Sequence, residues 1–348
     1  MVTENPFSLM YGKIPASFIE RDEEFTEITN TFSSKVPSTL AYMITGVRGA
    51  GKTVLMREVA KALREKQGFI TVDLNPQGKL IESFAQKLFY EGRAHKLFQD
   101  FELTINFKFA QLSIGGEEKI NDPEVVAERL IKDAKRKILV TIDETNNTQE
   151  MKKFANFYQS MIGEGYEVYL LMTGLENNID ALIQSKAASF LSRTPKIVLG
   201  PLDLVAIVNE YARVFGIDAA LASQLARLTK GYAFAYQVLG YFFYESKFRQ
   251  IEDGLLRKYD EYLRKNGYEV IWNELTAREQ QFCIALHKSI GKDAKEISRL
   301  VNIKESNYQN YRGSLIEKGI IEAKGYGKLD FTLPRFDEFI NAMMVYFD

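Results

Sequence analysis

Residues 41–60 read AYMITGVRGAGKTVLMREVA, an apolar run that breaks into glycines and then continues with helix-forming residues. Residues 46–53 fit the pattern G-x-x-x-x-G-K-[ST] at every fixed position. The glycines permit positive φ angles, so that successive backbone N–H groups converge on a phosphate. Residues 40–45 are predicted to form a strand and residues 52–66 an amphipathic helix, whose N-terminus favours an anion. Pattern and context together predict a phosphate-binding loop, against the alternative of a chance match in a glycine-rich turn.

Two side chains at the end of this loop have separate predicted tasks. Lys52 brings a flexible point charge to the β- and γ-phosphates, and Thr53 offers its hydroxyl to Mg²⁺. The predicted ligands are therefore ATP or ADP together with Mg²⁺. The residues predicted to bind the nucleotide in this stretch are Gly46, Val47, Arg48, Gly49, Ala50, Gly51, Lys52, Thr53 and Val54.

A second apolar run, KILVTIDE at residues 137–144, ends in two carboxylates. Such a run is typical of a parallel strand buried on both faces, and open α/β sheets bind ligands at the tips of these strands. Asp143 is predicted to hold Mg²⁺ through water, and Glu144 to orient or deprotonate the attacking water. An apolar strand followed by Asp-Glu is often only structural, but its distance from the loop favours the metal and water site.

Composition limits the classes of protein to consider. A chain of 348 residues predicts two or three domains, and the 45 basic against 46 acidic side chains exclude a protein that coats nucleic acid or membrane with its whole surface. The single Cys283 predicts a reducing compartment, and two histidines make a zinc site or a Cys–His pair improbable. Without a signal peptide or a long apolar run, the chain is expected to be cytoplasmic and to have no membrane partner.

Strands that alternate with helices predict an α/β fold, with a parallel sheet flanked by helices. GFITVDLNP after the first helix is another such strand. The stretch FELTINFKFAQLSIGGEE alternates Leu103, Ile105, Phe107 and Phe109 with polar residues, which indicates an inserted β-hairpin or edge strand at 101–116. Such an insert touches a partner or DNA in some proteins, and more often it only extends the fold.

In these motifs the sequence resembles the AAA+ and STAND P-loop ATPases, especially the origin-recognition-like prokaryotic branch, over residues 5–244. The stretch NPFSLMYGKIPASFIERDEEFTEI is similar to the family's N-terminal linker. The resemblance implies that Phe18, Ile19 and Arg21 lie near the adenine base. An ordinary helix N-terminus is the alternative.

The resemblance also implies two residues near the γ-phosphate. YEVYLLMTGLENN looks like the sensor-1 strand, with Thr173 facing that phosphate. Arg193, just before the strand at 196–199, matches the arginine finger, which acts within its own chain or on a neighbouring subunit's nucleotide. A surface arginine that caps a helix is the alternative. In the sensor-2 region Ala233 stands where the family favours proline, and the sensor-2 arginine is missing, so this contact is in doubt.

The C-terminal residues follow a different pattern. Thr276 and Glu279 predict a capping box, AKEISRLV a second helix, and Ser306 the start of a third that buries Tyr308, Tyr311 and Leu315. With the hairpin predicted at residues 320–333, this order resembles a winged helix-turn-helix. Predicted DNA contacts are Asn307, Asn310, Arg312 and Ser314 on the third helix, with Lys324, Tyr326 and Lys328 on the wing.

These elements predict four parts: a nucleotide-binding domain with its linker at 1–200, a helical lid at 201–248, a charged, solvated linker helix at 249–275, and the winged helix at 276–348. Residues 276–332 carry 10 Lys and Arg against 7 Asp and Glu, a modest basic surplus for a DNA-binding domain.

Two functions follow from this organisation. One is a slow, regulatory ATPase whose nucleotide state controls binding of duplex DNA. The other is a STAND-type switch in signalling or defence, whose winged helix contacts protein. A homo-oligomer joined through Arg193 fits either. Small-molecule phosphoryl transfer is disfavoured, because no substrate-binding insert is evident.

Overall fold

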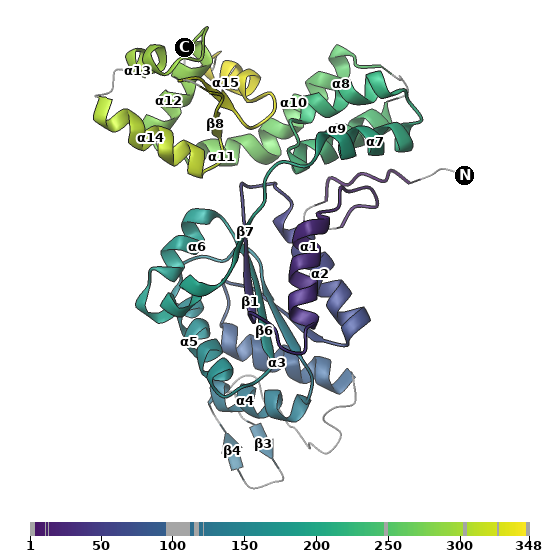
Figure 1. Cartoon of the computed structure of the whole chain (residues 1–348), viewed down its shortest axis with the longest axis vertical. Helices are drawn as coiled ribbons and strands as arrows, with labels where there is room; N and C mark the ends of the chain where they lie inside the picture. Colours follow the sequence, from purple (N-terminus) through teal and green to yellow (C-terminus); the bar gives the residue numbers. More distant parts are fainter. Residues whose placement is uncertain are drawn as a thin grey trace. The chain divides into compact units, whose positions relative to one another are not determined.

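The computed structural model describes residues 4–10, 12, 14–94, 112–114, 118–120, 122–246, 250–301, 305–325 and 327–345 (Figure 1). The chain forms two compact units. The first unit consists of Met1–Arg21, Gly46–Gly51 and Leu199–Asp348, and the second consists of Asp22–Thr45 and Lys52–Val198. The chain therefore passes between the units four times. This division differs from the four predicted parts, which remain a prediction.

A parallel sheet of five strands forms the centre of the second unit, in the order β2-β5-β6-β1-β7. The strands are β1 (Ala41–Thr45), β2 (Ile70–Leu74), β5 (Ile138–Ile142), β6 (Val168–Gly174) and β7 (Lys196–Val198). Every residue of β1, β5 and β6 is buried, which requires cover on both faces of the sheet. The predicted parallel α/β fold is confirmed. One boundary differs, because β5 ends at Ile142 and leaves Asp143 and Glu144 beyond the strand.

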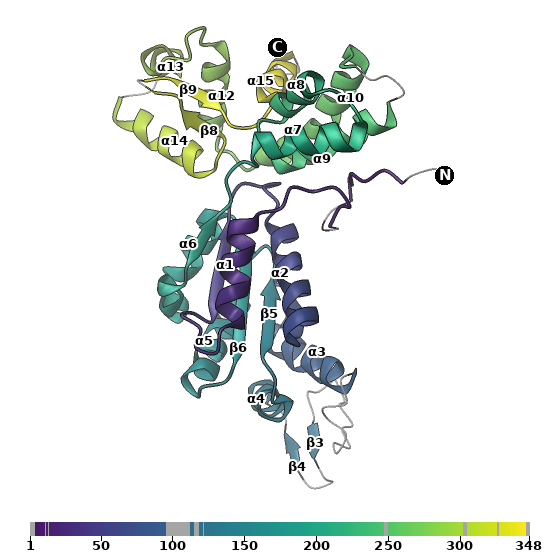
Figure 2. The ribbon, with the colours of Figure 1, turned by 45° about the vertical axis from the view of Figure 1, so that its right-hand side comes forward.

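Helices cover the sheet on both faces (Figure 2). They are α1 (Asp22–Ser33), α2 (Lys52–Gln67), α3 (Leu80–Ala94), α4 (Pro123–Ala134), α5 (Gln149–Gly163), α6 (Glu176–Ile183) and the 3-10 helix η1 (Lys186–Arg193). On one face, Phe32 of α1 packs against the rings of Tyr42 and Tyr169. On the other, Met43 and Leu170 share a core with α3, α4 and α5. Consecutive side chains of one strand thus pack on opposite faces of the sheet, because side chains alternate along a strand.

Most of the insert predicted at 101–116 lies outside the described residues, including Leu103, Ile105, Phe107 and Phe109. The described part consists of β3 (Leu112–Ile114) and β4 (Glu118–Ile120), which pair antiparallel. The role of this insert stays open.

The N-terminal segment of the first unit packs against helices of the stretch 201–248, which is predicted to be the lid. The Phe7 ring is buried among the rings of Tyr211, Phe215 and Tyr236. Gly240 lies in α9 (Ala233–Glu245), and a Cβ built on it would be 2.5 Å from the Phe7 ring. Any other residue at this position would therefore collide with the ring. The segment predicted as part of the nucleotide-binding domain thus has its core contacts in the first unit.

The first unit is otherwise helical. Its elements are α7 (Leu204–Phe215), α8 (Ala219–Thr229), α9 (Ala233–Glu245), α10 (Asp253–Leu263), the π-helix η2 (Arg264–Tyr268), α11 (Glu269–Asn273), α12 (Ala277–Lys288), α13 (Ala294–Val301), α14 (Glu305–Glu317), β8 (Ile321–Ala323), β9 (Leu329–Phe331) and α15 (Phe336–Val345). Across the described ranges, no helix combines the length and the apolar character needed to cross a membrane.

The segment at 249–275 is not simply a solvated helix. Leu255, Tyr259, Leu263 and Trp272 are buried and belong to the same core as the lid helices and the C-terminal helices. The charge alternation describes only the outer face, while large apolar residues at helical spacing bury the inner one.

We call α12 to α15 with the antiparallel β8–β9 pair the C-terminal module. The element order agrees with the expected three helices and hairpin, and the predicted capping box of Thr276 and Glu279 is confirmed. One expectation is wrong. Ser314 was predicted to face a DNA groove, but its hydroxyl donates a 2.6 Å hydrogen bond to the buried carboxylate of Glu279.

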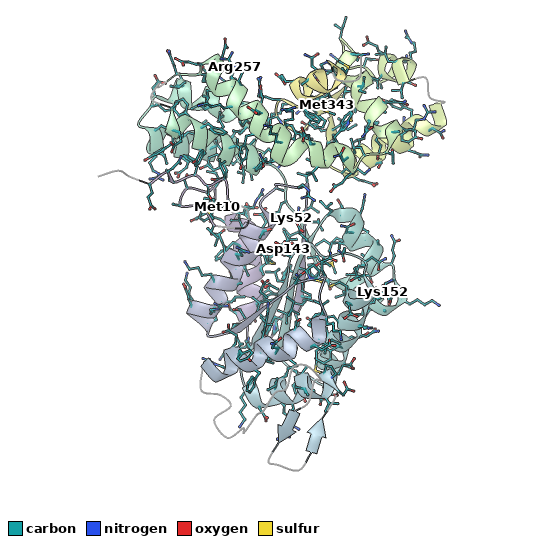
Figure 3. All side chains as sticks on the ribbon, turned by 180° about the vertical axis from the view of Figure 1, so that it is seen from behind. Met10, Lys52, Asp143, Lys152, Arg257 and Met343 are labelled. Atoms are coloured by element: carbon teal, nitrogen blue, oxygen red, sulfur yellow. The ribbon has the colours of Figure 1, made fainter. Side chains whose placement is uncertain are left out.

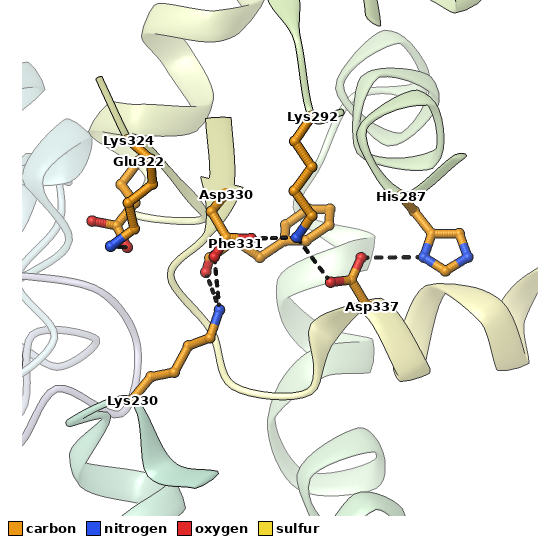
Figure 4. A network of polar contacts seen from close by, with 8 residues as sticks. All are labelled: Lys230, His287, Lys292, Glu322, Lys324, Asp330, Phe331 and Asp337. Atoms are coloured by element: carbon orange, nitrogen blue, oxygen red, sulfur yellow. Dashed lines mark hydrogen bonds and ion pairs between the residues drawn. The ribbon is translucent and has the colours of Figure 1, made fainter. Parts of the chain in front are cut away.

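A chain of charged groups runs through the first unit from the end of α8 to α12 (Figure 4). Lys230 and Lys292 both pair with Asp330. Lys292 also pairs with Asp337 at 3.3 Å, and Asp337 in turn contacts the His287 ring at 3.2 Å. The end of α8 is therefore joined to the C-terminal module by ion pairs.

Among the charged side chains that the structure describes in the module, Glu279 is the most deeply buried, at 3% exposure. Burial raises its pKa, but hydrogen bonds from Lys318, Ser314 and Thr276 outweigh this and lower it from 4.5 to about 2. Because the folded pKa lies below the ordinary value, the carboxylate stabilises the fold above that value, and the contribution is lost as the pH falls towards 2.

We expect Glu279→Gln to lower the free energy of unfolding at pH 7 by roughly 3 kcal/mol. It should also flatten the dependence of stability on pH between about 5 and 2. Urea unfolding followed over that range measures both. The control is Glu322→Gln, which breaks an exposed ion pair with Lys324 and should cost less than about 1 kcal/mol. Equal costs for the two variants would contradict the argument.

Candidate nucleotide-binding site

Lys52 and Thr53 are the first residues of α2, in the second unit. Figure 3 shows Lys52 and Asp143 at the same end of the sheet. The Thr53 hydroxyl donates a 2.8 Å hydrogen bond to Oδ2 of Asp143, ninety residues further along the chain. The structure thus brings together the two residues that the sequence predicts as metal-site neighbours. Val54, in the same helical turn, is half-buried.

These oxygen donors fit Mg²⁺. A hydroxyl and a carboxylate are the oxygen ligands that this ion accepts, and one or two protein groups suffice where phosphates complete the shell. Within the described part of the chain, no group of three or more His, Cys, Asp and Glu side chains is arranged to hold a metal by itself. Thr53 and Asp143 are accordingly the residues that would hold the ion beside a bound nucleotide.

Thr173 lies at the end of β6 and is fully buried. Its hydroxyl donates to Oδ1 of Asp143 and accepts the N–H of Glu144 at 3.3 Å. Its carbonyl oxygen accepts the N–H of Thr145 at 2.7 Å. The turn after β5 is therefore held by one residue of the neighbouring strand.

Glu144 has a φ angle of 54°, in the left-handed region. For a residue with a side chain this conformation costs roughly 1–2 kcal/mol. Its N–H bonds both Asp143 and Thr173, and its side chain is exposed. Strained backbone of this kind gathers at functional sites, where the surrounding contacts hold it.

The loop Gly46–Gly51 belongs to the first unit and packs there against the lid. The Tyr232 hydroxyl donates to the Arg48 carbonyl oxygen at 2.6 Å, and the Phe234 N–H donates to the Gly49 carbonyl oxygen at 3.0 Å. Gly49 has a φ of 78°, and a Cβ there would collide with the hydroxyl of Tyr232. Glycine is thus required at this position by close approach as well as by conformation.

The loop has further contacts inside the first unit. Arg21 donates to the carbonyl oxygens of Ala50 at 3.0 Å and Gly200 at 2.8 Å. Arg48 forms a 3.2 Å ion pair with Glu274, at the end of α11. Val47 lies against Gly319, at the turn between α14 and β8, where an added Cβ would collide with Cγ1 of Val47.

Sequence reasoning missed most of these loop partners. The sequence assigns no contact with the loop to Tyr232, Phe234, Glu274 or Gly319. Nothing local marks them, because 180 or more residues separate them from the loop in the chain. The single clue was the glycine-aromatic stretch that resembles a sensor-2 region.

The other predicted site residues are found in different surroundings. Phe18 and Ile19 are half-buried in the first unit, and Ile19 packs against its core. Arg21 is placed against the loop backbone, so its contact with a base stays a prediction. Arg193 is exposed at the end of η1 in the second unit.

Two of the predicted DNA contacts on α14, Asn307 and Asn310, are exposed, while Arg312 is half-buried. On the hairpin, Lys324 is exposed and pairs with Glu322 at 2.8 Å, and Lys328 is exposed. Tyr326 lies outside the described residues.

Residues 17–155 match the family model of the AAA ATPase domain. This stretch of the chain is thus similar to an AAA ATPase domain. Residues 265–340, at the opposite end, match a domain of unknown function, DUF8462, so the winged helix stays a prediction. The methionine import ATP-binding protein MetN of Lactobacillus acidophilus is 27% identical over 207 residues, 57% of this chain and 53% of that protein. The chain thus spans about half the length of this curated relative.

Two solved structures share the fold of this chain over nearly its whole length. The Walker-type ATPase PABY2304 of Pyrococcus abyssi is 14% identical, with a TM-score of 0.64 over 93% of this chain and 96% of its own. The ORC2 protein of Aeropyrum pernix, in its ADPNP–ADP complexes, is 14% identical, with a TM-score of 0.63 over 97% and 98%. At such identity the likeness establishes the fold alone, and it supports the resemblance to AAA+ ATPases.

The Val47–Gly319 contact suggests a matched pair of variants. Gly319 and Gly216 have φ angles of 62° and 61°, but only Gly216 has open space around it. We expect Gly216→Ala to cost about 1 kcal/mol of stability from its backbone alone. Gly319→Ala should cost more, and it should weaken binding of a fluorescent ATP analogue by displacing the loop.

Removal of the colliding methyl groups by Val47→Ala should restore both properties to the Gly319→Ala variant. Chemical denaturation and analogue titration measure the two effects. Equal losses at positions 216 and 319, with no rescue, would mean that the contact does not matter.

Proposed function

We propose that this chain is a Mg²⁺-dependent ATPase that hydrolyses ATP slowly and uses its nucleotide state to control the C-terminal module. The observation that carries the hydrolysis proposal is the hydrogen bond between Thr53 and Asp143. Thr53 is the last residue of the phosphate-loop pattern, and Asp143 directly follows β5, where the sequence predicts the metal and water site.

Each residue has one proposed role. The loop N–H groups and Lys52 bind the phosphates, while Thr53 and Asp143 hold the ion, which supplies charge neutralisation at the phosphates. Glu144, just beyond Asp143 and exposed, orients the attacking water and takes its proton. Arg193 stabilises negative charge on the γ-phosphoryl group, from its own chain or from a second copy. Phe18 and Ile19 contact the base.

Control of the C-terminal module is proposed from the loop's contacts inside the first unit. The loop binds the lid through Tyr232 and Phe234, and it touches the turn after α14 through Val47. Any rearrangement of the loop on phosphate binding must alter these contacts or move their partners. Nucleotide binding can therefore act, through the loop, on α14, the helix that is proposed to bind the partner.

Duplex DNA is the first proposed partner of the module. Asn307 and Asn310 on α14 are exposed, and an amide side chain is able to bond base edges. Arg312, Lys324 and Lys328 would contact phosphates. In this proposal α14 lies in the major groove and the hairpin follows the backbone.

A protein partner is the second candidate, favoured by a specific observation. Several cations of the first unit are already paired with carboxylates, which reduces the positive field available for DNA. These pairs include Lys230 and Lys292 with Asp330, Lys318 with Glu279, Lys324 with Glu322 and Arg335 with Asp260. Under this reading the chain is a switch of the STAND kind.

Two substitutions test the hydrolysis proposal. Lys52→Ala removes the phosphate-binding charge and should abolish binding of a fluorescent ATP analogue. Glu144→Gln keeps the size of the side chain but removes the base, so binding should persist while hydrolysis falls by about 100-fold or more. Normal hydrolysis by Glu144→Gln would show that another group activates the water.

Fluorescence anisotropy of a labelled random duplex tests the partner. Binding should require a slowly hydrolysed ATP analogue and weaken steeply as salt rises. Lys328→Ala should reduce the slope of log affinity against log salt by about 1. The control Lys153→Ala, on α5, should not change it. Absence of binding in every state would exclude DNA and favour the protein partner.

A further inference from the structure

Thr173 forms several hydrogen bonds with the turn that follows β5. It donates its only hydroxyl hydrogen to Asp143 and accepts the N–H of Glu144 with the same oxygen. Its main-chain oxygen accepts the N–H of Thr145 at 2.7 Å. Three successive residues of the turn are thus bonded to Thr173.

The residue at the centre of this turn has the strained backbone. Glu144 has a φ of 54°, and its N–H is held by the Thr173 hydroxyl and by Oδ1 of Asp143. The same Thr173 hydroxyl fixes that Oδ1 atom, while Thr53 bonds Oδ2. Both acceptors of the Glu144 N–H therefore depend on Thr173.

We propose that Thr173 is a positioning residue that holds Glu144 in its left-handed conformation, and so acts on hydrolysis through Glu144 rather than by contacting the γ-phosphate. The inference rests on the proposed ATPase function and deepens it. A hydroxyl has a single donor, and here that donor is directed at a carboxylate. Buried Thr173 on β6 thus fixes the backbone of Glu144, whose side chain is proposed to orient the attacking water.

Stability measurements test the clamp without any nucleotide. Thr173→Val removes the hydroxyl and should lower the melting temperature. Glycine adopts positive φ freely, so the loss caused by Thr173→Val should be clearly smaller in a Glu144→Gly background than in the wild type. The control is Thr141→Val, which removes the hydrogen bond from buried Thr141 of β5 to Asp73 of the neighbouring β2. Its stability loss should be equal in both backgrounds.

Nucleotide measurements then separate positioning from direct contact. Thr173→Val should lower kcat by roughly 10-fold to 100-fold, as loss of a supporting partner does, and should leave the ratio of ATP to ADP affinity unchanged. Thr173→Ser, which keeps the hydroxyl, should recover most of the rate. In a Glu144→Gln background, Thr173→Val should add little further loss.

Two results would overturn the inference: a stability loss that is the same with Glu144 and with glycine, or a changed affinity ratio with no change in kcat. If Thr173→Val does not fold, Thr173→Ala and Thr173→Ser provide the same comparisons. A wild-type protein that does not hydrolyse Mg-ATP would refute the proposed function, while the stability comparison would still decide whether the clamp exists.

Discussion

The carbonyl oxygens of Arg48 and Gly49 accept hydrogen bonds from Tyr232 and Phe234, and this pairing brings the phosphate loop into the first unit. The strand before the loop and the helix after it belong to the second unit. The loop is therefore a segment of the first unit that lies, in sequence, between two elements of the second. Its glycines serve this pairing too, since a side chain at position 49 would push Tyr232 away.

The second unit shows how much an amino-acid pattern determines by itself. The continuous apolar runs at 40–45 and 137–144 predict buried parallel strands, and β1 and β5 are buried at every residue. The loop pattern predicts that Thr53 and Asp143 are neighbours, and their side chains are hydrogen-bonded. Such features are predictable because a short stretch contains both the residue types and the spacing.

The remainder depends on contacts that no short stretch contains. The positive φ of Glu144 follows from a residue on another strand, and Ser314 turns inward because a buried carboxylate needs donors. The apolar face of the segment at 249–275 becomes evident only when the core it joins is known. In each case a distant partner overrides the local interpretation, as tertiary packing commonly does.

The four passages between the units also affect how the chain must fold during synthesis. Phe7 leaves the ribosome more than 200 residues before the Tyr211 and Tyr236 rings that bury it, and Arg48 of the loop leaves it 184 residues before Tyr232. The second unit, complete at Val198, is able to form its sheet while the first still lacks its helices. Until the helices that bury it have been synthesised, the Phe7 ring thus stays exposed, and exposed apolar groups of this kind are what chaperones bind.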